Sequence, residues 1–205
     1  ADGIRRKRLI WAPHHSIKAL PMLPPRSNFL WMADLMLTLA REYSDRLQIA
    51  FKPHSALKSK LYEDSRWGRQ RTDDYYQQWQ QMENTQLEAG QYVDLFMSSD
   101  AMIHDCGSFS VEYHYTKRPT MFVCKDLTPI EEVLSDFGKM ALRLHYLAAC
   151  EADIRRFIDD VVLEDHDTML AQREQFFNDH LMPPGGKSVA QNVLDDIVKE
   201  LGIEG

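Results

Sequence analysis

The feature that most constrains the fold is the alternation of short apolar runs with amphipathic segments. The apolar runs lie at 9–12, 47–51, 101–104 and 119–124, with a weaker one at 143–149. Each is short and is bordered by Pro or by charged or polar residues, which is typical of buried strands. Between them, apolar residues recur at spacings of three and four. This alternation predicts an α/β fold: a Rossmann-like parallel sheet with helices on both faces.

The helical segments have recognisable boundaries. We expect a helix over 29–43 with Ser27 as its N-cap, a partly exposed one over 73–89, and a short one within 92–100. Another starts near Ser108, one over 129–138 stops at Gly138, and the chain beyond 150 is helical. Residues 55–90 are polar, Gln-rich and aromatic, and suggest a family-specific insertion or a partner surface. No repeat or linker divides the chain, so residues 1–205 are expected to form one domain.

Composition excludes several classes of protein. The formal net charge of -7 argues against a nucleic-acid partner, which requires a basic face. Three widely spaced cysteines fit a reducing cytoplasm better than a disulfide framework or structural zinc. No apolar stretch approaches the roughly 20 residues of a spanning helix. The absent initiator Met suggests an excised fragment. The basic run Arg5–Arg8 reads as a solvated lead-in to a strand; the alternative is attraction to an anionic membrane surface.

Polar residues follow three of the predicted strands. They are His14 and His15, Lys52 and His54, and Asp105, Gly107 and Ser108. The carboxyl ends of parallel strands meet at one edge of a sheet, where ligands bind. The turn at Gly107-Ser108 would open a helix and offer backbone N–H groups to an anion. A phosphate or diphosphate fits this set better than a cation, with imidazolium and Lys52 supplying positive charge, so no metal and no cofactor are expected.

Each of these residues also has a purely structural interpretation. Asp105 could cap the following helix instead of binding a ligand. His104 is better explained as a hydrogen-bonded core histidine, and Cys106 as inert packing. For His54 a functional role is favoured over a structural one, because Pro53 makes the turn that carries His54 rigid. One histidine of the pair at 14–15 is expected to be structural, and the sequence leaves open which.

Two nucleotide-binding motifs are absent. The stretch "PPGGKS" ends like a phosphate-binding P-loop, but Leu181 occupies the position of the first Gly and no strand precedes it. There is no G-x-G-x-x-G fingerprint either. Residues 185–188 therefore read as a turn followed by an N-cap, which could still lie over a ligand.

The order of these motifs resembles the CDP-glycerol:poly(glycerophosphate) glycerophosphotransferases. That family has T-D-Y-S-S-x-x-x-D-Y followed by K-R-P; here "HDCGS" (104–108), Glu112-Tyr113 and "KRP" (117–119) stand at the same spacings. Lys52-Pro53-His54 is similar to the family's R/K-P-H strand end, and Gly186-Lys187-Ser188 to its DG-K-A/S-x-R turn. "IWAPHHS" is similar to the strand that opens the nucleotide-binding half. The resemblance covers about residues 8 to 201.

The resemblance implies a GT-B enzyme, of which this chain is the C-terminal, CDP-binding half. His54 would contact the donor diphosphate and assist departure of the leaving group. Ser108, Gly107 and the turn Gly186-Lys187-Ser188 would lie around the same diphosphate. The N-terminal half of the same protein would supply the general base, and the acceptor would be a polymer or a glycolipid at the inner face of the cell membrane.

The sequence departs from the family pattern at several positions. Cys106-Gly107 replaces Tyr-Ser, Gln191 stands near the family's Arg, and His14-His15 replaces Thr-Trp. These changes leave open which group the donor carries. A GT-B glycosyltransferase or epimerase that uses a nucleotide sugar is the first alternative. A second alternative is metal-dependent hydrolysis, with His14, His15, His54 and Asp105 as ligands. A third is a non-enzymatic nucleotide-binding or interaction domain.

Overall fold

The computed structural model describes residues 5–18 and 27–202 and contains a six-stranded sheet in which every paired neighbour is parallel. The strands are β1 (Lys7–Ala12), β2 (Leu47–Phe51), β3 (Thr85–Leu87), β4 (Ala101–His104), β5 (Thr120–Val123) and β6 (Tyr146–Ala148). Their order is β3-β2-β1-β4-β5-β6, so the chain reverses direction across the sheet between β1 and β4. This order is that of a Rossmann-like fold and confirms the predicted α/β class.

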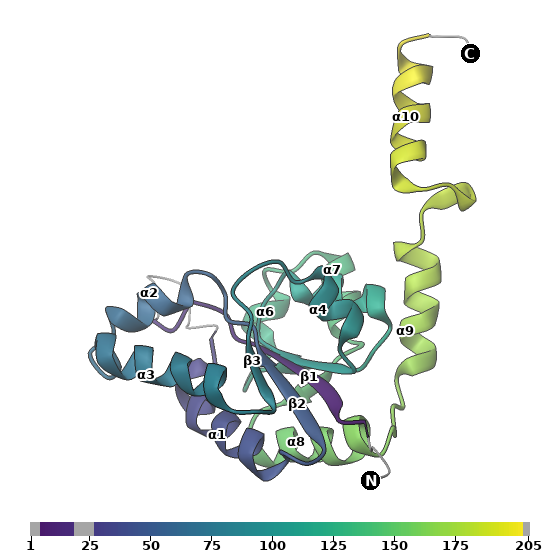
Figure 1. Ribbon diagram of the computed structural model, residues 1–205. Helices are drawn as coiled ribbons and strands as arrows, with labels where there is room; N and C mark the ends of the chain where they lie inside the picture. Colours follow the sequence, from purple (N-terminus) through teal and green to yellow (C-terminus); the bar gives the residue numbers. More distant parts are fainter. Residues whose placement is uncertain (1–4, 19–26, 203–205) are drawn as a thin grey trace.

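Helices cover both faces of the sheet (Figure 1). One face carries α1 (Phe29–Glu42), α2 (Leu57–Tyr62), α3 (Gly68–Gln81), and α8 (Glu151–Arg156), which continues into the π-helical η2 (Phe157–Leu163). The other carries α4 (Val93–Ser98), α5 (Phe109–Glu112) with the 3₁₀ turn η1 (Tyr113–Thr116), α7 (Asp136–Leu142), and α9 (Leu170–Phe176) with η3 (Phe177–Leu181). The remaining helices are α6 (Thr128–Glu131), η4 (Pro184–Gly186) and α10 (Val189–Glu200).

The larger core lies under α1 and α3 and is aromatic. Trp11 of β1 stacks on Phe51 of β2, with ring centroids 4.8 Å apart, and contacts Trp79 of α3 at 5.7 Å. Tyr75 and Trp79 are buried, so the expectation of a partly exposed helix over 73–89 holds only for its outer face. The helix also ends at Gln81, and the residues after it form the edge strand β3, which the sequence analysis did not predict.

The opposite face of β4, β5 and β6 is packed with histidine. His104, His114 and His145 are buried, and the ring of His145 lies 5.2 Å from His104 and 4.9 Å from His114. The backbone N–H of Cys106 donates to Nδ1 of His104 at 3.2 Å, which confirms His104 as a hydrogen-bonded core residue. Arg173 of α9 closes this layer, fully buried and ion-paired with Asp167.

Two predicted helix boundaries were wrong. The N-cap of α1 is Asn28, and the Oγ of Ser27 accepts from the N–H of Phe29 instead. Gly138 lies inside α7, where its N–H donates to Oγ of the N-cap Ser135 at 3.2 Å. The expected single helix over 129–138 is therefore two, α6 and α7, because Ser135 starts a new helix.

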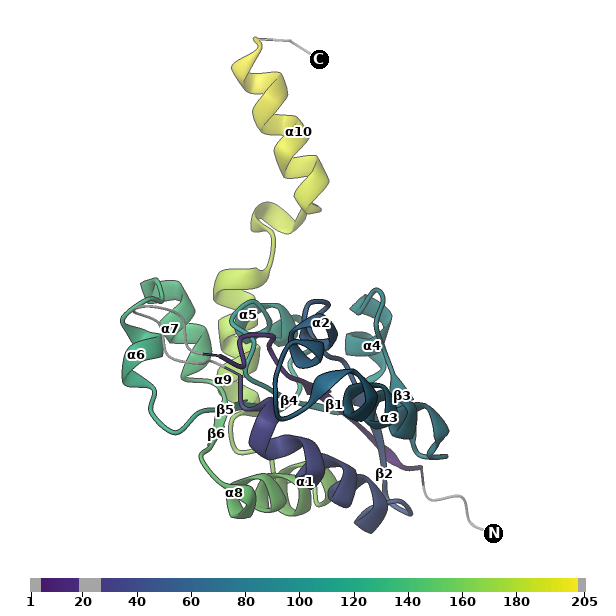
Figure 2. The same cartoon turned by 90° about the vertical axis from the view of Figure 1, so that its left-hand side faces the viewer.

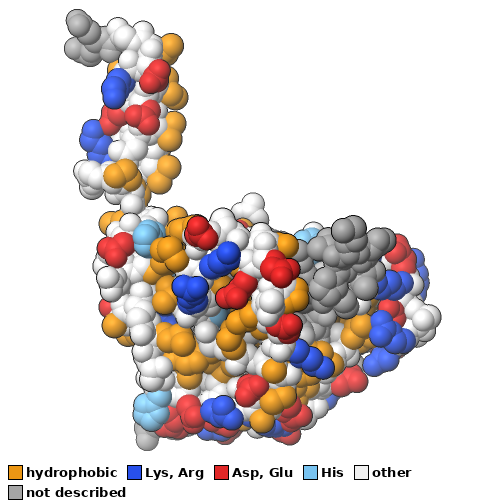
Figure 3. Space-filling view, turned by 180° about the vertical axis from the view of Figure 1, so that it is seen from behind, with side chains coloured by type: hydrophobic (Ala, Val, Ile, Leu, Met, Phe, Trp, Pro, Cys, Tyr) orange, Lys and Arg blue, Asp and Glu red, His pale blue; other side chains and the backbone are white. Residues whose placement is uncertain are grey.

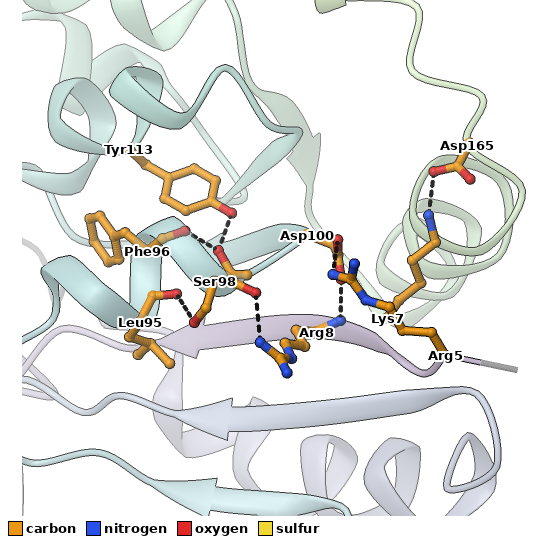
Figure 4. A network of polar contacts seen from close by, with 10 residues as sticks. Arg5, Lys7, Arg8, Leu95, Phe96, Ser98, Asp100, Tyr113 and Asp165 are labelled. Atoms are coloured by element: carbon orange, nitrogen blue, oxygen red, sulfur yellow. Dashed lines mark hydrogen bonds and ion pairs between the residues drawn. The ribbon is translucent and has the colours of Figure 1, made fainter. Parts of the chain in front are cut away.

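The basic run at the start of the chain is engaged within the molecule (Figure 4). Arg5 pairs with Asp100 at 3.2 Å, and Lys7 pairs with Asp165 at 2.5 Å. The backbone N–H of Arg8 also donates to Asp100, at 2.8 Å. These contacts favour the interpretation of the run as a lead-in to β1 that ties the strand to its neighbours.

The C-terminal helix α10 extends away from the sheet and its helices, as two views at right angles show (Figures 1 and 2). No side chain of α10 is buried. Its apolar residues lie along one side of the helix (Figure 3); those exposed are Val189, Val193, Leu194 and Ile197. In the part of the chain that the structure describes, no helix has the length and apolarity needed to cross a membrane.

Candidate functional site

The polar ends of β1, β2 and β4 meet at the reversal point of the sheet. In register, Trp11 lies beside Phe51, and Ala12 beside His104. Beyond the strands, the N–H of His54 donates to the carbonyl of Pro13 at 3.1 Å. The predicted convergence of these strand ends is therefore what the fold produces, at the place where α/β sheets of this order bind ligands.

Three imidazole rings lie together at this edge. The ring of His15 is 4.1 Å from that of His14 and 4.2 Å from that of His54, centroid to centroid. Burial lowers the pKa of His54, and repulsion from His15 when that ring is protonated and from Lys52 lowers it further. Burial and the nearby Lys60 likewise lower the pKa of His15. Both rings are therefore neutral at pH 7.

The three histidines could also be considered as metal ligands, since one possible ligand atom from each lies within 4.8 Å of the others. However, Nδ1 of His54 accepts the backbone N–H of Ala56 at 3.1 Å. A histidine that binds a metal through Nε2 carries a proton on Nδ1 and donates it to an oxygen. The turn around His54 thus disfavours metal coordination through Nε2 of that ring.

A cavity of about 300 Å³ opens beside His54. Its lining includes Lys52, His54, Tyr92, Cys106, Ser108 and Phe109. The ammonium group of Lys52 lies 5.8 Å from the centre of the Tyr92 ring, and the Tyr92 hydroxyl donates to Glu112 at 2.6 Å. Another cavity, of about 290 Å³, lies over β1–β3 among Arg8, Gln48 and Gln86. Because the two volumes are similar, it is the imidazole and lysine at the strand ends that distinguish the first.

Asp105 joins the segments that form the site through hydrogen bonds. Its carboxylate accepts the N–H of His14 at 2.6 Å, the N–H of Asn28 at 2.5 Å and the side-chain amide of Asn28 at 3.3 Å. Burial raises the pKa of Asp105 to about 6, although these N–H groups oppose the shift. Asp105 therefore holds the start of α1 and the loop after β1, and it does not cap the helix that follows it.

Ser108 occupies the N-cap position of α5, but its side chain makes no capping hydrogen bond. Its Oγ lies 3.6 Å from Sγ of Cys106, at the wall of the cavity. Gly107 is exposed, and a Cβ there would meet no atom within 4 Å. Since α5 has only four residues, its helix dipole is small. The Ser108 hydroxyl is the clearer donor at this turn.

The turn Gly186-Lys187-Ser188 is not brought to these strand ends. It precedes α10, where Ser188 is the N-cap and forms a capping box with Gln191, as the predicted turn and N-cap require. Lys187 pairs with Asp195 at 2.5 Å. Gly186 has φ of 68°, a left-handed conformation that favours glycine. Gln191, one of the departures from the family pattern, thus has a local structural role.

Three residues of the site were missed by the sequence analysis. Tyr92 and Phe109 line the cavity, and Asn28 links Asp105 to β5 by donating to the carbonyl of Val123 at 2.8 Å. Tyr92 follows β3, so it would have been noticed only if that strand had been recognised. Asn28 was overlooked because the neighbouring Ser27 also suits an N-cap.

The family model of the CDP-glycerol:poly(glycerophosphate) glycerophosphotransferases matches residues 27–199. Among curated proteins, no sequence matches the chain. Two solved structures of the wall teichoic acid polymerase TagF are similar to it. One has a TM-score of 0.55 at 19% identity over 97% of this chain and 45% of the polymerase. The other, a variant soaked with CDPG, has a TM-score of 0.56 at 18% identity over 97% and 44%.

At this level of identity the structural likeness shows the fold. The six-stranded parallel sheet described above shares its Rossmann-like fold with part of the TagF structures, which are of the GT-B type. The chain spans less than half of the length of these polymerases. The family model, in contrast, matches most of the chain, including the polar ends of β2 and β4 but not that of β1. The chain therefore belongs to the CDP-glycerol:poly(glycerophosphate) glycerophosphotransferase family.

Proposed function

We propose that this chain is the C-terminal, donor-binding half of a GT-B glycerophosphotransferase. It binds CDP-glycerol or a related CDP-activated donor, and the protein transfers a polyol phosphate to a polymer or glycolipid acceptor. The N-terminal half of the same protein supplies the acceptor site, and the chain alone is inactive. We place the reaction in the cytoplasm, at the inner face of the cell membrane.

One observation carries this proposal: Lys52, His54 and Ser108 converge on one cavity at the reversal point of the sheet, in a chain of this family. A diphosphate in that cavity would receive hydrogen bonds from the imidazole and the hydroxyl, and its charge would be offset by the ammonium group. This arrangement is held in place by its neighbours His14, His15 and Asp105. Gly107 precedes Ser108 in the same turn and is exposed.

In the proposed reaction, an acceptor hydroxyl oxygen attacks the phosphorus that carries the glycerol. The bond between that phosphorus and the bridging oxygen breaks, and its electron pair stays on the CMP phosphate. Lys52 and His54 stabilise the charge that develops there. The proton of the acceptor hydroxyl leaves to a base outside this chain. The turn Gly186-Lys187-Ser188 would reach the bound donor only after a movement of the segment that carries α10.

Calorimetry with CDP-glycerol, CMP, UDP and ADP tests the proposal on the chain itself. CDP-glycerol and CMP should bind, and Lys52→Ala or Ser108→Ala should weaken CDP-glycerol about tenfold or more. Lys199→Ala, a change on the exposed side of α10, is the matched control and should leave affinity unchanged. Preference for UDP or ADP would instead indicate a nucleotide-sugar enzyme. No heat with any of the four would refute the proposal.

A further inference from the structure

Three strands of the sheet end in the same local turn around a histidine. In each, the ring Nδ1 accepts the backbone N–H of the residue two positions later. The donors are Ser16 to His14 at 3.3 Å, Ala56 to His54 at 3.1 Å, and Cys106 to His104 at 3.2 Å. Nδ1 of His14 also lies 2.8 Å from Oγ of Ser16, and Nδ1 of His104 lies 3.1 Å from the carbonyl oxygen of Cys106, so the backbone contact alone fixes the proton position only at His54. His54 is the one that lines the cavity. The backbone thus forms the same contact after β1, β2 and β4.

This contact fixes where the proton of His54 sits. A backbone N–H can only donate, so the Nδ1 that it faces must present a lone pair. The neutral ring then carries its proton on Nε2. Adding a second proton would place N–H groups of His54 and Ala56 against each other across 3.1 Å and would break the hydrogen bond.

The charges around His54 act in the same direction. Lys52 stands on its own strand end, the rings of His14 and His15 lie 5.2 and 4.2 Å away, and Lys60 faces the cluster from α2. Lys60 is itself 3.6 Å from Glu63. The nearest strand-end carboxylate, Asp105, is occupied by N–H groups of His14 and Asn28. No group in this set favours a positive charge on the His54 ring.

We infer that His54 serves the proposed reaction as a neutral imidazole, a fixed Nε2–H donor to the donor diphosphate that never becomes an imidazolium. The inference rests on the proposed function for the identity of the ligand. It departs from the imidazolium expected from the sequence. Lys52 then supplies the full positive charge at this end of the cavity, and His54 orients the diphosphate through a directional hydrogen bond.

Nitrogen-15 NMR of the histidine-labelled chain tests the protonation state without any ligand. The His54 ring, identified by the signals lost in His54→Gln, should show a protonated Nε2 and an unprotonated Nδ1 between pH 8 and pH 6. The same pattern should persist with CDP-glycerol bound. A ring protonated on both nitrogens at pH 7, in either state, would overturn the inference.

Binding of CDP-glycerol to position-54 variants gives a second test. A Gln amide can place an N–H near the position of Nε2 but cannot take up a proton, whereas Asn is too short and Ala has no donor. His54→Gln should bind within about threefold of the wild type, and His54→Asn and His54→Ala should lose about tenfold or more. Wild-type affinity should stay constant from pH 8 to pH 6, because the doubly esterified diphosphate keeps its charge.

The inference fails if His54→Gln loses as much affinity as His54→Ala, or if wild-type affinity rises about tenfold for each unit that the pH falls. If Zn²⁺ binds the chain tightly and His54→Gln removes that binding, the cluster is a metal site and the inference also fails. Absence of all nucleotide binding would instead refute the proposed function, and the NMR pattern would then decide the state of His54 alone.

Discussion

Asp105 illustrates how one buried carboxylate can position a site without touching its cavity. It receives N–H groups from the loop after β1 and from the first residues of α1, and so joins segments that are far apart in the sequence. Its ionised form is stabilised only by these donors, because the side chain is almost fully buried. The geometry of His14 and, through it, of the imidazole cluster depends on this carboxylate.

Asp105→Asn is expected to lower the free energy of unfolding by about 1–3 kcal/mol. The new amide has only one oxygen, so its NH₂ group must face a backbone N–H, and that pair of donors cannot form a hydrogen bond. Urea unfolding followed by circular dichroism measures this. Asp94→Asn is the matched control, since Asp94 is exposed on α4. Equal stability of the two variants would show that the Asp105 contacts do not support the fold.

At the scale of elements, the two faces of the sheet are built differently. Under α1 and α3 the sheet packs on an aromatic core, whereas under η1, α7 and α9 it packs on His104, His114 and His145. Among the described residues, none accepts or donates a hydrogen bond at Nε2 of His104, Nδ1 of His114 or Nε2 of His145. A proton added to this layer would therefore be a buried charge without a partner.

Helix α3 is expected to depend on Trp79, which packs against both Trp11 and Phe51. Trp79→Ala should lower the unfolding free energy by about 3–5 kcal/mol through the cavity that it leaves. Gln77→Ala, on the exposed side of the same helix, should change it by less than about 0.5 kcal/mol. Chemical denaturation of both variants makes the comparison; similar midpoints would contradict the packing described here.

The histidine layer is expected to make the fold sensitive to acid. Burial lowers the pKa of His104 to about 3 and that of His114 to about 4, and it holds that of His145 well below its ordinary value. Because the unfolded chain binds protons first, stability is full above about pH 6.5 and falls as the pH drops toward these values. At pH 5, His104 and His114 should each lower the free energy of unfolding by about 2 kcal/mol.

Asp105 acts in the opposite direction, since its raised pKa means that the folded state gains a proton first. Because one carboxyl group opposes three histidines, the net effect of acid is a loss of stability. Unfolding free energies at pH 7.5 and pH 5 should therefore differ strongly in the wild type and less in His114→Gln, whose amide can still reach the carbonyl of Ala141. An unchanged pH dependence in that variant would rule out His114 as a source of the acid sensitivity.

At the scale of the whole molecule, α10 is a separate unit of structure. Its polar contacts are with the turn before it, as between Asn192 and the carbonyl of Pro184 at 3.0 Å. The rest of its surface faces solvent, including an apolar side. The sheet and its covering helices do not draw stability from it.

Ending the chain after Pro183 should leave the thermal midpoint within about 2 °C of the full chain, because no side chain of α10 is buried. The shortened chain should also associate less with itself, since the exposed apolar side is gone. Scanning calorimetry and sedimentation velocity measure the two effects. A drop of the midpoint by about 5 °C or more would show that α10 packs on the domain in solution.

Most of the sheet could be predicted because five of its strands are apolar runs with clear borders, and the parallel arrangement then brings their polar ends together. The edge strand β3 has three residues and no apolar run, so nothing in its sequence distinguishes it from the end of α3. Tyr92 was missed for that reason. The tautomer of His54 could not be predicted either, because it depends on the distance from its ring to the N–H of Ala56.

The aromatic core has a practical consequence for spectroscopy. All four tryptophans of the chain, Trp11, Trp31, Trp67 and Trp79, belong to β1, α1 or the segment that forms α3. Tryptophan fluorescence, excited selectively, therefore reports on this half of the molecule, because β5, β6 and α9 contain no tryptophan. A fluorescence transition at a different denaturant concentration from the circular dichroism transition would reveal that the two halves of the sheet come apart separately.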